Sequence, residues 1–214
     1  MFPSASRCFP LLLLAGLTGC TTKEACPPST LAAKPGQPDW RDVITDPDHG
    51  RLRGWRRALV DSLASARASG NGAAIDAEGP LLDPDITLDG ATPPVGFYHC
   101  RMIKLGAKGQ SHQDFIAYPA HRCQVRPSTG TLKLVELDGR QRPSGRLYPD
   151  SQSRTVFLGT MILGDEMKPI GYGRDPDRDM VGAVQRVGDQ RWRVLMPYPA
   201  WESTMDVMEL VPES

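Results

Sequence analysis

The sequence predicts a mainly β protein (α+β). Its body is a single antiparallel β-barrel or barrel-like sheet of about eight strands, with one N-terminal amphipathic helix packed on it. Three observations indicate this class. From residue 95 onward, apolar residues alternate with polar ones in short segments. Turn residues separate these segments at intervals of about 8–15 residues. No helical period lies between the segments, which argues against parallel βαβ units.

The expected strands are short and rich in β-branched and aromatic residues. About eight or nine antiparallel strands must close into a barrel or stack as a sandwich to protect their edges. We expect an up-and-down or partly open barrel, with a two-sheet sandwich as the alternative. The segments are 95–105, 113–126, 131–138, 144–149, 154–163, 168–173, 180–188, 190–197 and 205–211.

One helix is predicted over residues 46–69, to be packed over an opening or a face of the barrel. Asp46 is a suitable N-cap, and Gly70 is a natural C-terminal stop. Residues 70–94 are rich in Gly, Pro and Asp, so we expect an irregular connection to the β-body of 95–212, with one helical turn at 73–77. The helix carries one apolar stripe with a period of 3.6, formed by Leu52, Trp55, Leu59, Leu63 and Ala66.

The first residues form an export signal rather than part of the fold. An apolar run over residues 9–17 follows Arg7 and is too short to span a bilayer. Leu17-Thr18-Gly19-Cys20 comes next and resembles the lipobox of bacterial lipoproteins. The resemblance implies removal of residues 1–19 and lipidation of Cys20, whose thiolate accepts the diacylglycerol. An ordinary signal peptide with an incidental cysteine is the alternative.

The Pro-rich residues 20–38 are expected to form a tether between the lipid and a single domain of residues 39–214. Thr21, rather than Asp, follows the modified cysteine, which favours the outer membrane facing the periplasm. We therefore expect a cell-envelope protein that contacts the membrane through the lipid on Cys20. Cys26 lies in the tether and has no predicted partner.

Cys100 and Cys123 fall in successive expected strands. A hairpin with its turn near 106–112 would place them about opposite each other, and the exported compartment is oxidising, so a disulfide is predicted. A metal site with the adjacent His99 and His121 is the alternative. Neighbours in a strand point to opposite faces, so at most three ligands would converge. We expect no metal and no cofactor.

The composition argues against some classes of function. The 25 Lys and Arg balance 25 Asp and Glu, so the formal net charge is zero. This balance argues against a nucleic-acid binder, which needs an excess of cations. The sequence contains no nucleophile elbow, phosphate-binding loop or zinc motif, and no catalytic residue is assigned.

Two groups of residues are candidates for a binding site. Residues 173–179 alternate acidic positions as a calcium loop does, but Met180 and Arg186 stand where an EF-hand needs Gly and Glu. A turn held by Arg–Asp pairs is the alternative. Tryptophans near the C-terminus could rim a ligand groove or close the core at a strand end. The candidates are Arg174, Asp175, Asp177, Arg178, Asp179, Trp192 and Trp201.

Short motifs spread over residues 39–213 carry a family resemblance. They are Trp40-Arg41, the helix around Trp55, 96–101 (GFYHCR), 103–106 (IKLG), 118–120 (YPA), 157–160 (FLGT), 172–175 (YGRD), 178–179 (RD), 191–193 (RWR) and 209–212 (ELVP). With these motifs the chain resembles a bacterial family of exported proteins known as domain of unknown function 4893. The resemblance implies one exported domain with no established reaction and no catalytic residues to transfer.

Three classes of function remain open. We expect a non-enzymatic envelope lipoprotein that binds a protein partner or a small ligand in the periplasm, because small barrels can hold one small ligand. A purely structural envelope protein is the second class. The third is an envelope hydrolase that uses His99 or His121 with carboxylates from residues 175–179.

Overall fold

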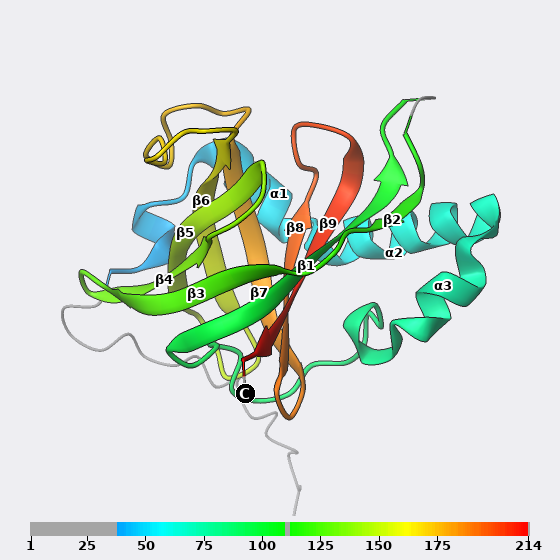
Figure 1. Ribbon diagram of the computed structural model, residues 1–214, viewed down its shortest axis with the longest axis horizontal. Helices are drawn as coiled ribbons and strands as arrows, with labels where there is room; N and C mark the ends of the chain where they lie inside the picture. The colour runs from blue at the N-terminus through cyan, green and yellow to red at the C-terminus, as the bar shows by residue number, and fades with distance from the viewer. Residues whose placement is uncertain (1–37, 110–111, 214) are drawn as a thin grey trace, which may run out of the picture.

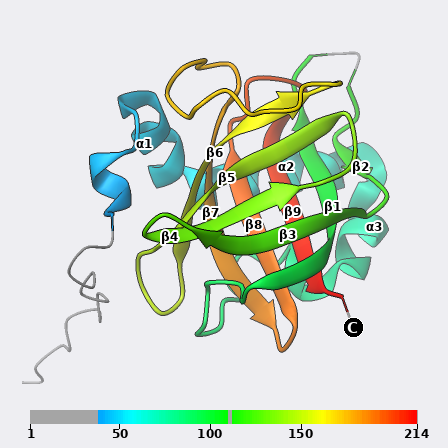
Figure 2. The same cartoon turned by 60° about the vertical axis from the view of Figure 1, so that its left-hand side comes forward.

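An antiparallel sheet that closes on itself forms the body of the protein in the computed structural model, which describes residues 38–109 and 112–213 (Figures 1 and 2). From β3 to β9 neighbours along the chain pair in turn, β1 pairs with both β2 and β3, and β9 closes against β1. The strands are β1 (Gly96–Ala107), β2 (Phe115–Ala117), β3 (His121–Ser128), β4 (Thr131–Glu136), β5 (Gln141–Pro149), β6 (Thr155–Leu163), β7 (Asp179–Gly188), β8 (Arg191–Pro197) and β9 (Ser203–Pro212).

The structure confirms the predicted antiparallel barrel and excludes the sandwich. Eight strands make the barrel, and β2 is an extra strand that pairs with residues 103–105 in the C-terminal part of β1.

Two of the predicted strands were wrong. The segment 113–126 is divided into β2 and β3, because Pro119 between them has no amide hydrogen for a ladder. Residues 168–173 form turns, where Gly173 has a φ of 80° that favours glycine. The predicted leader, Cys20 and the tether up to residue 37 lie outside the described residues.

The predicted disulfide between Cys100 and Cys123 is present. The register places Cys100 opposite His121 and Cys123 opposite Tyr98, so the cysteines are diagonal neighbours rather than direct partners. Their Cα atoms are 5.8 Å apart, and both side chains face the barrel interior.

The predicted helix over 46–69 is two helices, α1 (Asp46–Arg53) and α2 (Trp55–Ala66). Gly54 separates them with φ −87° and ψ 2°, which are not helical. The helical turn expected at 73–77 within the connection of 70–94 is present as α3 (Gly72–Ala77). No helix in the described part of the chain is long and apolar enough to cross a membrane. Short 3₁₀ or π turns are η1 (Trp40–Asp42), η2 (Arg67–Asn71) and η3 (Gly79–Leu81).

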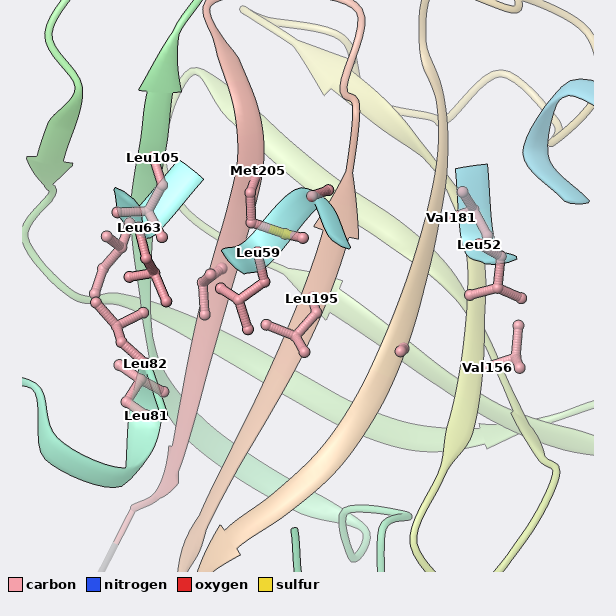
Figure 3. Close-up of a cluster of buried hydrophobic side chains, with 14 of the residues drawn as sticks. Leu52, Leu59, Leu63, Leu81, Leu82, Leu105, Val156, Val181, Leu195 and Met205 are labelled. Atoms are coloured by element: carbon pink, nitrogen blue, oxygen red, sulfur yellow. The ribbon is translucent and has the colours of Figure 1, made fainter. Parts of the chain in front are cut away.

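The helices cover the outer face of the barrel and not an opening. Helix α2 packs on β1, β8 and β9, and α1 packs on β7 and β8. The apolar stripe predicted from the sequence forms much of this contact, since Leu52, Leu59 and Leu63 are buried against the strands. Figure 3 shows these leucines with strand residues Leu105, Val156, Val181, Leu195 and Met205.

A second apolar cluster fills most of the barrel interior. Gly145 and Gly159 face each other across β5 and β6, and the Phe157 ring lies over both. A Cβ at Gly159 would lie 2.6 Å from the backbone oxygen of Ser144, so only glycine fits this close approach. The cluster also holds Tyr98, Val125, Leu134, Leu147, Val184, Trp192, Val194, Met208 and Leu210.

A fully buried arginine attaches an irregular segment to the outside of the barrel. Arg193 on β8 is 0% exposed and donates to the backbone oxygens of Leu81 (2.8 Å), Asp83 (2.7 Å) and Ile86 (2.9 Å). Its Nε also donates to Oε1 of Gln185 at 3.0 Å. Burial lowers the pKa of Arg193 to about 10, so the side chain remains charged at neutral pH.

Gly159→Ala should destabilise the barrel, because the new methyl group meets backbone atoms that cannot move independently. We expect a loss of about 1–3 kcal/mol in the free energy of unfolding, measured by urea denaturation. Gly50→Ala is the matched control. A Cβ at Gly50 in α1 meets nothing within 4 Å, so this variant should be unchanged or more stable by up to about 1 kcal/mol. Equal stability of the two variants would contradict the close approach of β5 and β6.

Candidate functional site

One end of the barrel interior is not filled by the apolar cluster. A cavity of about 260 Å³ lies there and is lined in part by Glu202 of the loop between β8 and β9, a loop that is at the top of Figure 1. We call it the barrel mouth. Side chains that point inward from the strands line it, together with the rim residues Tyr118, Pro119 and Gln141. The inward-facing residues are Met102 and Lys104 of β1, His121 of β3, Glu136 of β4, Met161 of β6 and Asp206 of β9.

A buried ion pair forms one wall of the barrel mouth. Lys104 and Asp206 are directly opposite on β1 and β9, and Nζ lies 3.2 Å from Oδ2. Glu202 in the β8–β9 loop places Oε2 3.1 Å from the same Nζ, and Ser203 donates its hydroxyl to Asp206. Burial alone would lower the pKa of Lys104, but the two carboxylates outweigh it and raise the pKa. The lysine is therefore charged and fully paired.

The opposite wall holds a carboxyl group beside an imidazole. Oε1 of Glu136 lies 3.5 Å from Nδ1 of His121, which is too far for a hydrogen bond. Nδ1 is buried and has no hydrogen-bond partner among the residues that the structure describes. Burial raises the pKa of Glu136 to about 8, so this carboxyl is mostly protonated at neutral pH and can donate a hydrogen bond.

Gly139 in the turn between β4 and β5 determines where the imidazole lies. Its φ is +97°, and a Cβ there would lie 2.7 Å from Nδ1 of His121. Any other residue would be strained and would push the ring away from its place beside Glu136. The turn therefore sets the geometry of this wall.

The arrangement suits a small amphipathic molecule better than an ion. The charge of Lys104 is neutralised within the protein, Glu136 presents a neutral acid, and Arg140, the other cation that lines the mouth, is exposed. Met102 and Met161 supply apolar surface that adapts to the shape of a ligand. Among the described residues, no group of three or more His, Cys, Asp or Glu could hold a metal ion.

Part of the predicted charged segment lies beside the barrel mouth. Asp177, Arg178, Asp179 and Trp201 line a small hollow that shares Lys104, Gln141, Met161 and Asp206 with the mouth. Most of their polar contacts stay within the segment or its own loop. Arg178 pairs with Glu166 at 2.7 Å and with Asp175 at 3.4 Å, and the carboxylate of Asp175 also accepts from the amide of Asp177.

The structure does not bring the other predicted residues to the mouth. Trp192 is 4% exposed in the interior cluster, and its Nε1 donates to the backbone oxygen of Gly90. Arg174 lines neither hollow, and its amide donates to the Gly171 oxygen. His99 lies on the outward face of β1, next in sequence to the inward Cys100. Among the residues that the structure describes, no hydrogen bond or ion pair joins His121 to residues 175–179.

Sequence reasoning missed Lys104, Glu136 and Asp206 as members of a site. Each stands between apolar residues of an expected strand, in MIKL, LVEL and MDVM. A charge at an inward position of a barrel strand is a signal that could have found all three. Assigning inward positions requires the strand register, which the sequence alone left open.

Glu136→Gln should remove a pH dependence of stability. The folded protein keeps the proton on Glu136 up to a pKa of about 8, whereas the unfolded chain releases it near about 4.3. Folded chains then hold more protons than unfolded ones, so the wild type should lose stability as the pH rises from about 5 to about 8. The loss relative to Glu136→Gln is at most about 1.4 kcal/mol per pH unit. Urea unfolding at several pH values measures it.

Glu166→Gln is the control for this experiment. The amide of Leu163 and the side chain of Arg178 hold the pKa of Glu166 below its ordinary value, so this group titrates below the window. The variant should keep the wild-type slope. An unchanged slope in Glu136→Gln would contradict the neutral carboxyl in the barrel mouth.

Comparison with known proteins gives a family and no function. No curated protein and no solved structure matches the chain. A family model described as "Domain of unknown function (DUF4893)" matches residues 40–210, which include the three α-helices, strands β1 to β8, most of β9 and the barrel mouth. The chain therefore belongs to the DUF4893 family.

Proposed function

We propose that this protein is a lipid-anchored envelope protein whose barrel mouth binds a small, uncharged, amphipathic molecule in the periplasm. The observation that carries the proposal is the barrel mouth itself. Most of the barrel interior is closed by apolar side chains, whereas the mouth keeps a cavity of about 260 Å³. This volume of about 260 Å³ is slightly below the usual range for ligand sites, which begins at about 300 Å³, so the mouth fits only a small ligand.

The polar groups of the mouth define the ligand. Nδ1 of His121 and the protonated carboxyl of Glu136 provide hydrogen-bonding groups on one side. A buried polar atom without a partner costs free energy, and a ligand that pairs with it removes this cost. The cation of Lys104 already has two carboxylates, so a charged ligand gains little there. An uncharged molecule with a hydrogen-bonding end and an apolar end satisfies both walls.

An envelope hydrolase is the less supported alternative. It would need His121 to work with an acid, and Glu136 at 3.5 Å is the acid beside it, rather than a carboxylate from residues 175–179. None of the described residues that line the mouth is a nucleophile held by a base. Ser203 is hydrogen-bonded to Asp206, and the two cysteines in the barrel wall form a disulfide.

Ligand binding is tested by native mass spectrometry of the mature chain, residues 20–214 with Cys20→Ser, exported behind an ordinary signal peptide and never denatured. We expect a reproducible non-covalent adduct on the wild-type mouth. Gln141→Trp at the exposed rim should obstruct the cavity and reduce the adduct at least tenfold. Gln124→Trp, on the outward face of β3, is the control and should keep it.

Two results would overturn the proposed ligand site. One is an adduct that survives in Gln141→Trp, which would place the molecule elsewhere. The other is a mass without any adduct, which would favour a protein partner or a purely structural role in the envelope. Two missing hydrogens in the unfolded wild type would independently report the disulfide.

The anchor is tested separately by metabolic labelling with radioactive palmitate. The wild type should incorporate label and appear in the outer-membrane fraction of a density gradient. Cys20→Ser should lose the label completely, whereas Cys26→Ser should retain it. Label that persists in Cys20→Ser, or an unlabelled wild type, would contradict lipidation of Cys20.

A further inference from the structure

A row of cations without acidic partners crosses the outer face of the barrel. Arg126, Lys133 and Arg146 are direct cross-strand neighbours on β3, β4 and β5. Their side chains point outward, because the residues next to them along each strand fill the interior. None of the three forms an ion pair with any residue in 38–109 or 112–213. Like charges placed directly opposite each other destabilise a sheet.

Two buried hydroxyl groups lie on the same outer face. Ser144 of β5 and Thr160 of β6 are direct cross-strand neighbours and are only 3% and 2% exposed. Neither hydroxyl has a hydrogen-bond partner among the described residues. Each unpaired buried hydroxyl costs roughly 1–3 kcal/mol, so two side by side indicate a site that a ligand completes.

One groove brings these features together. It has a volume of about 350 Å³, and Lys133, Ser144, Arg146 and Thr160 all line it. Its floor is the outer face of β4, β5 and β6, and residues 169–172 form a wall. Among the described residues, no Asp or Glu lines the groove. Asp179 lies opposite Thr160 on β7 but outside the groove, and its Oδ1 accepts from the amide of Gly173.

We propose that this outer groove binds a phosphate group, with Lys133 and Arg146 as its cationic ligands and Ser144 and Thr160 as hydroxyl donors. An anion between the cations replaces their repulsion with attraction. A phosphate has enough oxygens to accept from both cations and both hydroxyls, whereas a carboxylate has only two oxygens. The arginine fork can bind phosphate through two parallel hydrogen bonds. Soluble phosphate esters and anionic phospholipid headgroups carry this same group.

The first test is thermal unfolding of the mature chain with Cys20→Ser, in sodium phosphate and in sodium chloride of equal ionic strength. Phosphate should raise the midpoint of the wild type, because a ligand that binds only the folded state stabilises it. The double variant Lys133→Gln/Arg146→Gln should bind phosphate at least tenfold more weakly. Arg53→Gln/Arg57→Gln, on exposed helix positions, has the same net charge and should keep the wild-type response.

Ser144→Ala separates binding from folding. In chloride this variant should be at least as stable as the wild type, because it removes an unpaired buried hydroxyl. In phosphate its unfolding midpoint should rise less than that of the wild type, as expected for an affinity that is several-fold weaker. Full retention of the phosphate response in both Ser144→Ala and the double glutamine variant would overturn the site. An equal loss in the helix control would show nonspecific screening and would also overturn it.

Vesicles distinguish the two sources of the group. The same unacylated chain is sedimented with vesicles of phosphatidylcholine, with and without phosphatidylglycerol. A headgroup site predicts binding only with phosphatidylglycerol, lost in Lys133→Gln/Arg146→Gln and competed by inorganic phosphate. A site for soluble esters predicts stabilisation by glycerol phosphate without vesicle binding. A chain that responds to neither probe has no phosphate site in this groove.

Discussion

The closing seam between β1 and β9 is the constraint on which the rest of the molecule depends. Only when these strands pair does every other strand acquire an inside and an outside. Ion pairs lie on both faces of the seam, Lys104 with Asp206 inside and Arg101 with Glu209 outside, and each pair joins residues that are directly opposite. The inner pair forms a wall of the barrel mouth, so the strand pairing that closes the barrel also positions this wall of the site.

The period of two in the sequence predicted the barrel, because each strand buries one face on a packed interior. Segments such as 154–163 and 190–197 match β6 and β8 closely. The same reasoning failed for the predicted helix, because a stripe of buried apolar residues does not show where the backbone leaves the helical conformation. The apolar stripe from Leu52 to Ala66 continues across Gly54, since both helices cover the same outer surface. Pro119, through which the predicted strand of 113–126 ran, would have been the better guide to a strand end, because a missing amide hydrogen acts locally.

The candidate site was less accessible to sequence reasoning than the fold. Lys104 and Asp206 are far apart in the chain, and only closure brings them together. His121 and Glu136 meet because the β3–β4 register and the turn at Gly139 place them on one wall. The cation row on the outer face likewise depends on the exact pairing of three strands. A shift of one residue in any pairing would move these side chains to the opposite face. The two cysteines could be paired in advance because their strands lie close together in the sequence, so their pairing needs no long-range register.

The contacts of Arg193 have a consequence for how this family can vary in sequence. Its guanidinium binds backbone oxygens of residues 81, 83 and 86, and every amino acid provides such an oxygen. Side chains of this segment are therefore free to change between relatives, as long as the path of the backbone is kept. The arginine itself has no such freedom, because a lysine ammonium cannot reproduce a planar fork of donors. Relatives should therefore differ in the attached segment and agree at the arginine that attaches it.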